Sequence, residues 1–312
     1  MNRKHILKVF AGLIAVSVIQ AAALSRADQQ TPLDEEVAPR QYTFSWMFTE
    51  SGTMKPRGGT TSGPEVQLDR RTSEAFANLQ AAQTDAERMA MSDKPYLSLM
   101  GSILWAIVMT RPDCAYYGSF LCQFMADPTI ACWEAAIALL SYMYATRHLG
   151  ILYKRCKNVR LSLYCDSSYN SVPKPMYGYV IFANGAPVSW AAKKQKIVPQ
   201  SSCEAETAAL CAGCKNLVFV KNLLSELGAN VTLPMDTYTD NDAARLSTIN
   251  PGTTARTKHY EIWMRYCREL YLKLVITVNW VPTKEQIADL FTKPLDKTTF
   301  LYLRSLLMTE QR

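Results

Sequence analysis

The spacing of hydrophobic residues changes from helical to strand-like near residue 160. Between Lys94 and Tyr153, apolar residues recur at helical intervals, most regularly in Trp133–Tyr144. From Arg160 to Asp166, polar and apolar residues alternate as they do in a half-buried strand. The pattern therefore predicts a small helical region followed by an α/β region.

The α/β region is predicted to begin with three antiparallel strands. Asn184-Gly185, a dipeptide that favours tight hairpin turns, separates the apolar runs Tyr177–Phe182 and Val188–Trp190. A long helix is expected over Cys203–Leu227, with Gly228 at its end. The later elements are predicted to be a strand at Met235–Asp240, a helix at Arg256–Leu272, a strand at Leu274–Val281 and a helix at Lys284–Lys293.

Two aspartates stand at the ends of predicted strands. Asp166 ends the first strand, and Asp240 ends the strand expected beside it, about 4.8 Å away. Two carboxylates at such a separation repel each other, and a shared cation would relieve that repulsion. The alternative is that each aspartate begins a turn, as in Asp240-Asn241-Asp242.

A glutamate lies on the apolar face of the long predicted helix. Glu206 shares the face formed by Leu210, Leu217 and Leu224 at steps of three and four residues. Glu204 lies about 200° around the helix and is expected to be solvent-exposed or a cap partner. A carboxylate on a buried face needs a compensating partner, and a metal ion would be one.

Composition narrows the class of protein only slightly. The chain has 312 residues, of which 48% are hydrophobic and 20% charged, values that exclude wholesale disorder. The net charge of +7 is compatible with a polyanionic partner without proving one. Nine cysteines form no regular framework, which suits a reducing compartment. Cys211 and Cys214 lack a second ligand pair, so we interpret them as buried helix residues rather than a zinc site.

The N-terminus has the three parts of a secretory signal peptide. Met1–His5 is basic, Ile6–Ile19 is mostly apolar, and Gln20–Ser25 ends in small residues. We expect residues 1–25 to direct secretion, with no stable membrane association after cleavage; the alternatives are an uncleaved anchor or a chance apolar start. Residues 26–93 are predicted to be an acidic and polar linker of low order.

Several motifs of the α/β region resemble the ribonuclease H domain of Copia-type retrotransposons. The resemblance implies a ribonuclease H-like fold over residues 160–295, with a five-stranded mixed sheet and flanking helices. The matching segments, in chain order, are WAAKKQ (Trp190–Gln195), SSCEAETAAL (Ser201–Leu210), YTDNDAA (Tyr238–Ala244), TKHYEI (Thr257–Ile262) and VPTKEQIADLFTKPL (Val281–Leu295).

The same resemblance implies a set of site residues. The family's catalytic, metal-binding acids fall on Asp166, Glu206, Asp240 and Asp289, and imply two Mg²⁺ (or Mn²⁺) ions. Asp289 rests on the resemblance alone, because it lies opposite the apolar stripe of its predicted helix. An RNA·DNA hybrid would be held through its phosphates, unless the lysines concerned form only a solvated cluster. These lysines are Lys193, Lys194, Lys196 and Lys258.

The helical region resembles the end of a Copia-type reverse transcriptase. The resemblance covers residues 94–155 and includes PYLSLMGSILW (Pro95–Trp105), TRPDCAY (Thr110–Tyr116) and FMADPT (Phe124–Thr129). No paired-aspartate polymerase motif occurs in the chain, so we do not expect it to copy RNA into DNA. Residues 296–312 are predicted to form a C-terminal helix or tail.

Three functional hypotheses follow. The favoured one is a secreted effector that suppresses host defence or cell death. The N-terminus supports it, because a signal peptide followed by the acidic Asp34–Glu36 resembles oomycete RxLR-type effectors. A complete Arg-x-Leu-Arg motif is absent, however. It would act on a host protein in the host cytoplasm or nucleus, and Asn230 would become a glycosylation site on the secretory route. The alternatives are a retrotransposon ribonuclease H that cleaves the RNA strand of RNA·DNA hybrids, and an inert relic.

Overall fold

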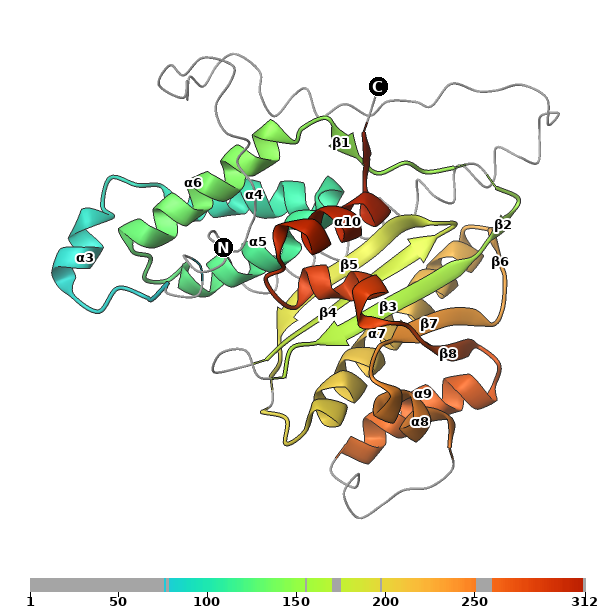
Figure 1. The fold of residues 1–312 in the computed structure, drawn as a ribbon. Coiled ribbons are helices and arrows are strands. Elements are labelled where there is room, and N and C mark those ends of the chain that lie inside the picture. The colour runs from blue at the N-terminus through green and yellow to red at the C-terminus, as the bar shows by residue number, and fades with distance from the viewer. Residues whose placement is uncertain are drawn as a thin grey trace, which may run out of the picture.

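The computed structural model describes residues 76, 79–154, 156–169, 175–196, 198–250 and 260–310. The predicted signal peptide and most of the predicted linker lie outside these residues, as do Lys258 and the start of the helix expected from Arg256. Figure 1 shows a mixed β-sheet with helices on both of its faces. None of the helices in the described part of the chain is long and apolar enough to cross a membrane.

A five-stranded sheet forms the centre of the α/β region. Its order is β5-β4-β3-β7-β8, in which β4 runs antiparallel to both β3 and β5, while β3, β7 and β8 are parallel to one another. This arrangement confirms the predicted ribonuclease H-like fold. The strands span Leu161–Ser167 (β3), Met176–Ala183 (β4), Ala186–Lys194 (β5), Met235–Thr239 (β7) and Ile276–Trp280 (β8).

Three helices cover one face of the sheet. The long helix α7 (Ser202–Glu226) packs on β3 and β4, and α8 (Asp242–Ile249) and α9 (Glu261–Leu272) pack against it (Figure 1). The core on this side includes Leu163, Leu210 and Leu217, all fully buried. Cys211 and Cys214 belong to the same core with free thiols, which agrees with their interpretation as packing residues.

The helical region covers the other face of β4 and β5. Its core is continuous with that of the C-terminal helix, and the indole Nε1 of Trp190 on β5 donates a hydrogen bond to the carbonyl of Ile107 at 3.2 Å. The two predicted regions therefore share one hydrophobic core. The helices are α3 (Asp85–Ala90), α4 (Tyr96–Thr110), η3 (Pro112–Cys114), α5 (Ala115–Leu121), η4 (Cys122–Phe124) and α6 (Ile130–Ala145).

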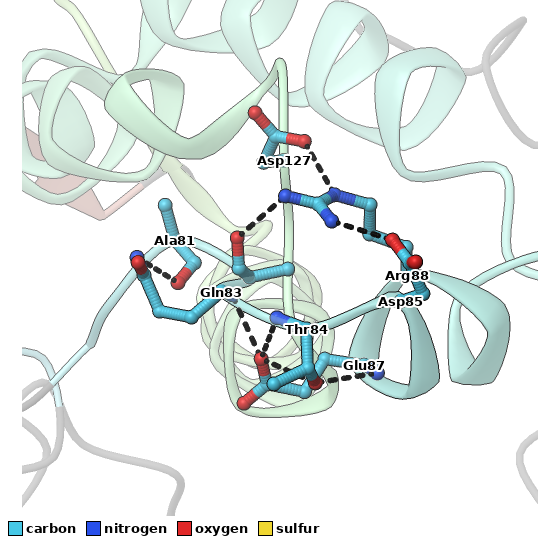
Figure 2. A network of polar contacts seen from close by, with 8 residues as sticks. Ala81, Gln83, Thr84, Asp85, Glu87, Arg88 and Asp127 are labelled. Carbon is cyan, nitrogen blue, oxygen red and sulfur yellow. Dashed lines mark hydrogen bonds and ion pairs between the residues drawn. The ribbon is translucent and has the colours of Figure 1, made fainter.

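The short helix α3 lies within the segment predicted as linker and is fixed by polar contacts. The backbone nitrogens of Gln83 and Thr84 donate to Glu87 Oε2 at 2.8 and 2.9 Å, which closes a capping box (Figure 2). Arg88 reaches both Asp85 and Asp127, at 2.9 and 3.2 Å (Figure 2). These contacts join α3 to the loop that precedes α6.

Short strands tie distant parts of the chain together. β1 (Leu149–Gly150) pairs antiparallel with β9 (Thr309–Glu310), and β2 (Asn158–Val159) pairs parallel with β6 (Asn230–Val231). The first pair joins the end of the helical region to the C-terminus.

The helix predicted over Lys284–Lys293 is wrong. The chain forms two 3₁₀ segments there, η6 (Thr283–Glu285) and η7 (Ile287–Phe291), before α10 (Lys297–Leu307). Gln286 is extended between them, and its side chain accepts a hydrogen bond from the backbone nitrogen of Ala288. The tighter 3₁₀ winding changes which residues share a face, so Asp289 is buried with its apolar neighbours.

Candidate metal centre

Three of the predicted acids converge at one end of the sheet. Asp166 lies near the end of β3, Asp240 directly follows β7, and Glu206 lies in the first turns of α7. One carboxylate oxygen of each lies within 4.8 Å of the other two. The parallel pairing of β3 and β7 produces this convergence, because it brings the ends of both strands to the same edge.

The orientation of Glu206 follows from its place on the buried face of α7. Its Oε1 accepts a hydrogen bond from the backbone nitrogen of Ser167 at 3.2 Å, next to Asp166. Its Oε2 is buried and has no hydrogen-bond partner among the described residues. An unsatisfied buried carboxylate oxygen is costly, and it fits a site that takes up a cation.

The pKa values of the acids also fit a site that takes up a cation. Burial raises the pKa of Glu206 well above its usual range, and the charges of Asp166 and Asp240 raise it further. Burial and Asp166 also raise the pKa of Asp240, although its Oδ2 accepts a hydrogen bond from Thr283 Oγ1 at 2.9 Å. The charged forms are thus destabilised by one another, and oxygen ligands of this kind suit a hard divalent cation.

Asp289 lies beside this triad, on η7. Its side chain is buried, and burial together with the Asp166 charge raises its pKa to about 8. Lys293 Nζ forms an ion pair with Asp289 Oδ1 at 2.9 Å. Thr292 Oγ1, directly after η7, also donates to Asp166 Oδ2, so this end of η7 is tied to the triad. Neither Thr292 nor Lys293 was predicted as a site residue, although both lie within the last motif.

A glycine allows η7 to approach the sheet. Gly178 on β4 pairs with Asp166 on β3, and a Cβ atom at this glycine would lie 2.3 Å from Cβ of Phe291. Any side chain here would push η7 outward, and Asp289 with it. The close approach of Phe291 explains why this strand position is glycine.

Glu204 has a separate task from Glu206. Its backbone nitrogen donates to Ser201 Oγ at 3.1 Å, and its Oε2 accepts from the backbone nitrogen of Gln200 at 2.7 Å. Glu204 therefore caps α7, which was one of the two roles predicted for it, a cap partner or a solvent-exposed residue. The other alternative is wrong, because Glu204 is only 5% exposed.

The predicted substrate lysines do not form one surface. Lys193, Lys194 and Lys196 are all exposed, but Lys194 Nζ donates to Gln123 Oε1 of η4 at 2.8 Å. Lys193 and Lys194 are consecutive on β5 and therefore point to opposite faces of the sheet. The fourth lysine, Lys258, lies outside the described residues.

The predicted glycosylation site is accessible. Asn230 is exposed on β6, and its Nδ2 donates to Asn158 Oδ1 on the paired strand β2 at 2.9 Å. A glycan attached at this nitrogen would replace one of its two hydrogens and leave the other to donate to Asn158.

The strand order and the acids at its edge define a ribonuclease H-like domain with a candidate divalent-metal centre. No family model matches the chain. The retrovirus-related Pol polyprotein from transposon RE1 of Arabidopsis thaliana is 34% identical over 209 residues, which cover 66% of this chain and 14% of that polyprotein. This relative and the similar polyprotein from transposon RE2 of the same plant show that the homologues of this chain are Copia-type retrotransposon Pol polyproteins, of whose full length the chain spans a small part.

The chain is also similar to a secreted effector protein in sequence and, more weakly, to a solved RNase H domain in structure. Secreted RxLR effector protein 161 of Plasmopara viticola is 35% identical over 133 residues, which cover 42% of this chain and 94% of that protein. The N-terminal RNase H domain of rv2228c from Mycobacterium tuberculosis, solved as a fusion with maltose binding protein, is 17% identical with a TM-score of 0.33. That match covers 47% of this chain and 98% of the solved chain. We assign the fold from the strand order and not from this weak structural likeness.

Proposed function

We propose that the protein is a metal-dependent ribonuclease that cleaves the RNA strand of RNA·DNA hybrids. The observation that carries the proposal is the convergence of Asp166, Glu206 and Asp240, with Glu206 Oε2 buried and unpartnered among the described residues. Similarity to Pol polyproteins supports a nucleic-acid substrate, and so does the net charge of +7.

The four acids would hold two Mg²⁺ (or Mn²⁺) ions. When bound, these ions would supply an activated water and stabilise the charge on the leaving 3′ oxygen. Asp166 is central to the site, because its charge raises the pKa of each of the other three acids, Glu206, Asp240 and Asp289. Lys293 would hold Asp289 in place and add positive charge beside the scissile phosphate.

The contacts to the hybrid would be made mainly through phosphates. Lys193 and Lys196 are exposed near the end of β5 and would hold the nucleic-acid backbone without reading its sequence. Lys194 contributes less in this proposal, since it is engaged with Gln123.

The two glutamates of α7 provide a matched test. Glu206→Gln should reduce cleavage of a labelled RNA strand in a hybrid by more than about 100-fold, because Glu206 is proposed as a direct ligand and even residues that only support a ligand cost about 10–100-fold. Glu204→Gln should retain the wild-type rate, because Glu204 only caps the helix. Equal loss in both variants would contradict the proposal, and so would cleavage without any divalent ion.

A second candidate function is that of a secreted effector that acts on a host protein. The match to secreted RxLR effector protein 161, over 94% of its length, favours it. No disulfide joins any of the nine cysteines, all of which lie in the described part of the chain, and this suits a reducing host cytoplasm or nucleus. The signal peptide that this candidate requires, residues 1–25, lies outside the described residues.

Expression inside plant cells separates the two candidates. An effector that lacks residues 1–25 should dampen a triggered cell-death response, and a fragment with only ribonuclease activity should not. If suppression also survives in Asp166→Asn/Asp240→Asn, the domain acts as a binding scaffold. If neither form suppresses the response, the effector candidate is wrong.

A further inference from the structure

Two buried glutamines flank the acids and have no part in the proposed chemistry. Gln195 follows β5 and is 3% exposed, and Gln286 lies between η6 and η7 and is fully buried. Each belongs to a motif that the sequence shares with its family, yet neither is charged. Buried amides need hydrogen-bond partners, so their contacts show what they hold.

Gln195 connects the neighbours of two acids. Its Nε2 donates to Ser167 Oγ at 2.8 Å and to the backbone carbonyl of Ala205 at 3.1 Å. Ser167 directly follows Asp166, and Ala205 directly precedes Glu206. Its Oε1 has no partner among the described residues, so the connection depends on the Nε2 donor.

Gln286 makes a similar connection on the other side of Asp166. Its Nε2 donates to the backbone carbonyl of Cys165 at 3.0 Å, and its Oε1 accepts from the backbone nitrogen of Ala288 at 3.2 Å. Cys165 directly precedes Asp166, and Ala288 directly precedes Asp289. The amide therefore links the backbone of β3 to that of η7.

We propose that Gln195 and Gln286 are positioning residues that hold Asp166, Glu206 and Asp289 at the spacing a divalent cation requires. The inference rests on the proposed function, because it assumes that these acids bind metal. Without a cation the carboxylates repel one another, and the backbone must resist that repulsion. Neutral amides can fix the spacing without adding charge, which a lysine or a glutamate at the same positions could not.

Gln195→Met and Gln286→Met test the inference in the full chain. Methionine has a similar volume but cannot donate, so each variant loses the connection with little change in packing. We expect the dissociation constant for Mn²⁺, measured by electron paramagnetic resonance of the free ion, to rise about 10–100-fold in each variant. Raising the Mn²⁺ concentration should restore occupancy.

Tyr96→Phe is the matched control. Tyr96 is buried in the helical region, and its hydroxyl donates to the backbone carbonyl of Leu121 at 3.0 Å. Loss of this hydroxyl also removes a buried side-chain-to-backbone hydrogen bond, so it should lower stability about as much as the glutamine substitutions do. Its Mn²⁺ affinity should equal that of the wild type.

The outcomes distinguish the two proposals. If the wild type binds no Mn²⁺, the proposed function and the inference both fail. If the wild type binds Mn²⁺ and the glutamine variants bind it equally well, only the inference fails. Should a methionine variant not fold, Ser167→Ala removes the Oγ that accepts from Gln195 Nε2, and Gln286→Leu removes the Gln286 donor without adding charge. Unchanged Mn²⁺ affinity in both would also overturn the inference.

Discussion

The protein contains two groups of buried charges that differ in how they are balanced. In the helical region, Arg111 forms a bidentate pair with Asp113, with Nε–Oδ1 and Nη2–Oδ2 distances of 2.9 and 2.7 Å. Arg111 also donates to the carbonyl of Met143 and to Thr146, and the Tyr142 hydroxyl donates to Asp113. Burial would raise the pKa of Asp113, but the Arg111 charge and the hydrogen bonds from Arg111 and Tyr142 together outweigh it and hold this pKa below its usual value.

The group at the sheet edge is not balanced in this way. Glu206, Asp240 and Asp289 all have raised pKa values, because they are buried beside other carboxylates. Lys293 compensates only part of this charge. The first group is a closed network that needs no further partner, whereas the second leaves buried carboxylates without an equal positive charge, and the proposed cation would supply it. Burial of charge alone therefore does not mark a functional site, but unbalanced burial does.

The largest effect is expected from opening the closed network. Asp113→Ala should lower the free energy of unfolding by about 3–5 kcal/mol, because it leaves the Arg111 guanidinium buried without its carboxylate. Urea denaturation of the full chain measures this loss. The double variant Arg111→Met/Asp113→Leu should recover part of it, and a double variant as unstable as the single one would show that the pair does more than balance charge.

At the sheet edge, removal of buried charge is expected to raise the free energy of unfolding instead of lowering it. Asp166→Asn/Asp240→Asn should raise the stability of the metal-free protein by about 1–3 kcal/mol, since it removes mutual repulsion between buried carboxylates. The same variant should lose the stabilisation that Mg²⁺ or Mn²⁺ gives the wild type. Thermal unfolding with chelator and with metal checks both. Destabilisation in the presence of chelator would mean that the acids are balanced by something else.

A smaller effect is expected from pH. Burial beside Asp166 raises the pKa of Asp289 to about 8 in the folded protein, above the ordinary aspartate value of about 4. Between these two pH values, the folded state therefore binds more protons than the unfolded state. Stability of the metal-free protein should therefore fall as pH rises from about 4 to about 8. Saturating Mn²⁺ should abolish this fall. Denaturation at several pH values would contradict the explanation if metal left the slope unchanged.

The smallest effect is expected at the helix cap. Glu204→Gln keeps an acceptor for the Gln200 nitrogen but loses the charge at the N-terminus of α7, which costs about 0.5 kcal/mol. Its Mn²⁺ affinity should remain that of the wild type. A loss of affinity as large as that of Glu206→Gln would place Glu204 in the metal centre after all.

The sequence predicted the positions of three of the four acids at the sheet edge from local patterns. Strand alternation placed Asp166 and Asp240 at strand ends, and helix periodicity placed Glu206 on the buried face, because these positions depend on local patterns. Asp289 could not be placed in this way, since η7 is a 3₁₀ segment that packs on Gly178 of a distant strand. The family resemblance identified it without explaining its position.

Contacts between distant segments could not be predicted from local patterns at all. The Arg111–Asp113 network depends on Tyr142, which lies on another helix, and Tyr142 in turn accepts a hydrogen bond from Arg304 on α10. The hydrogen bonds from Gln195 to Ser167 and from Gln286 to Cys165 likewise join residues that lie far apart in the chain. Only the folded arrangement distinguishes such side chains from ordinary buried polar residues.

The most direct test of the unbalanced acidic centre is a Mn²⁺ titration of the full chain, followed by electron paramagnetic resonance. The proposed centre predicts saturable binding in the wild type, loss of that binding in Asp166→Asn/Asp240→Asn, and unchanged binding in Glu204→Gln. Equal Mn²⁺ affinity in the wild type and in Asp166→Asn/Asp240→Asn would contradict it.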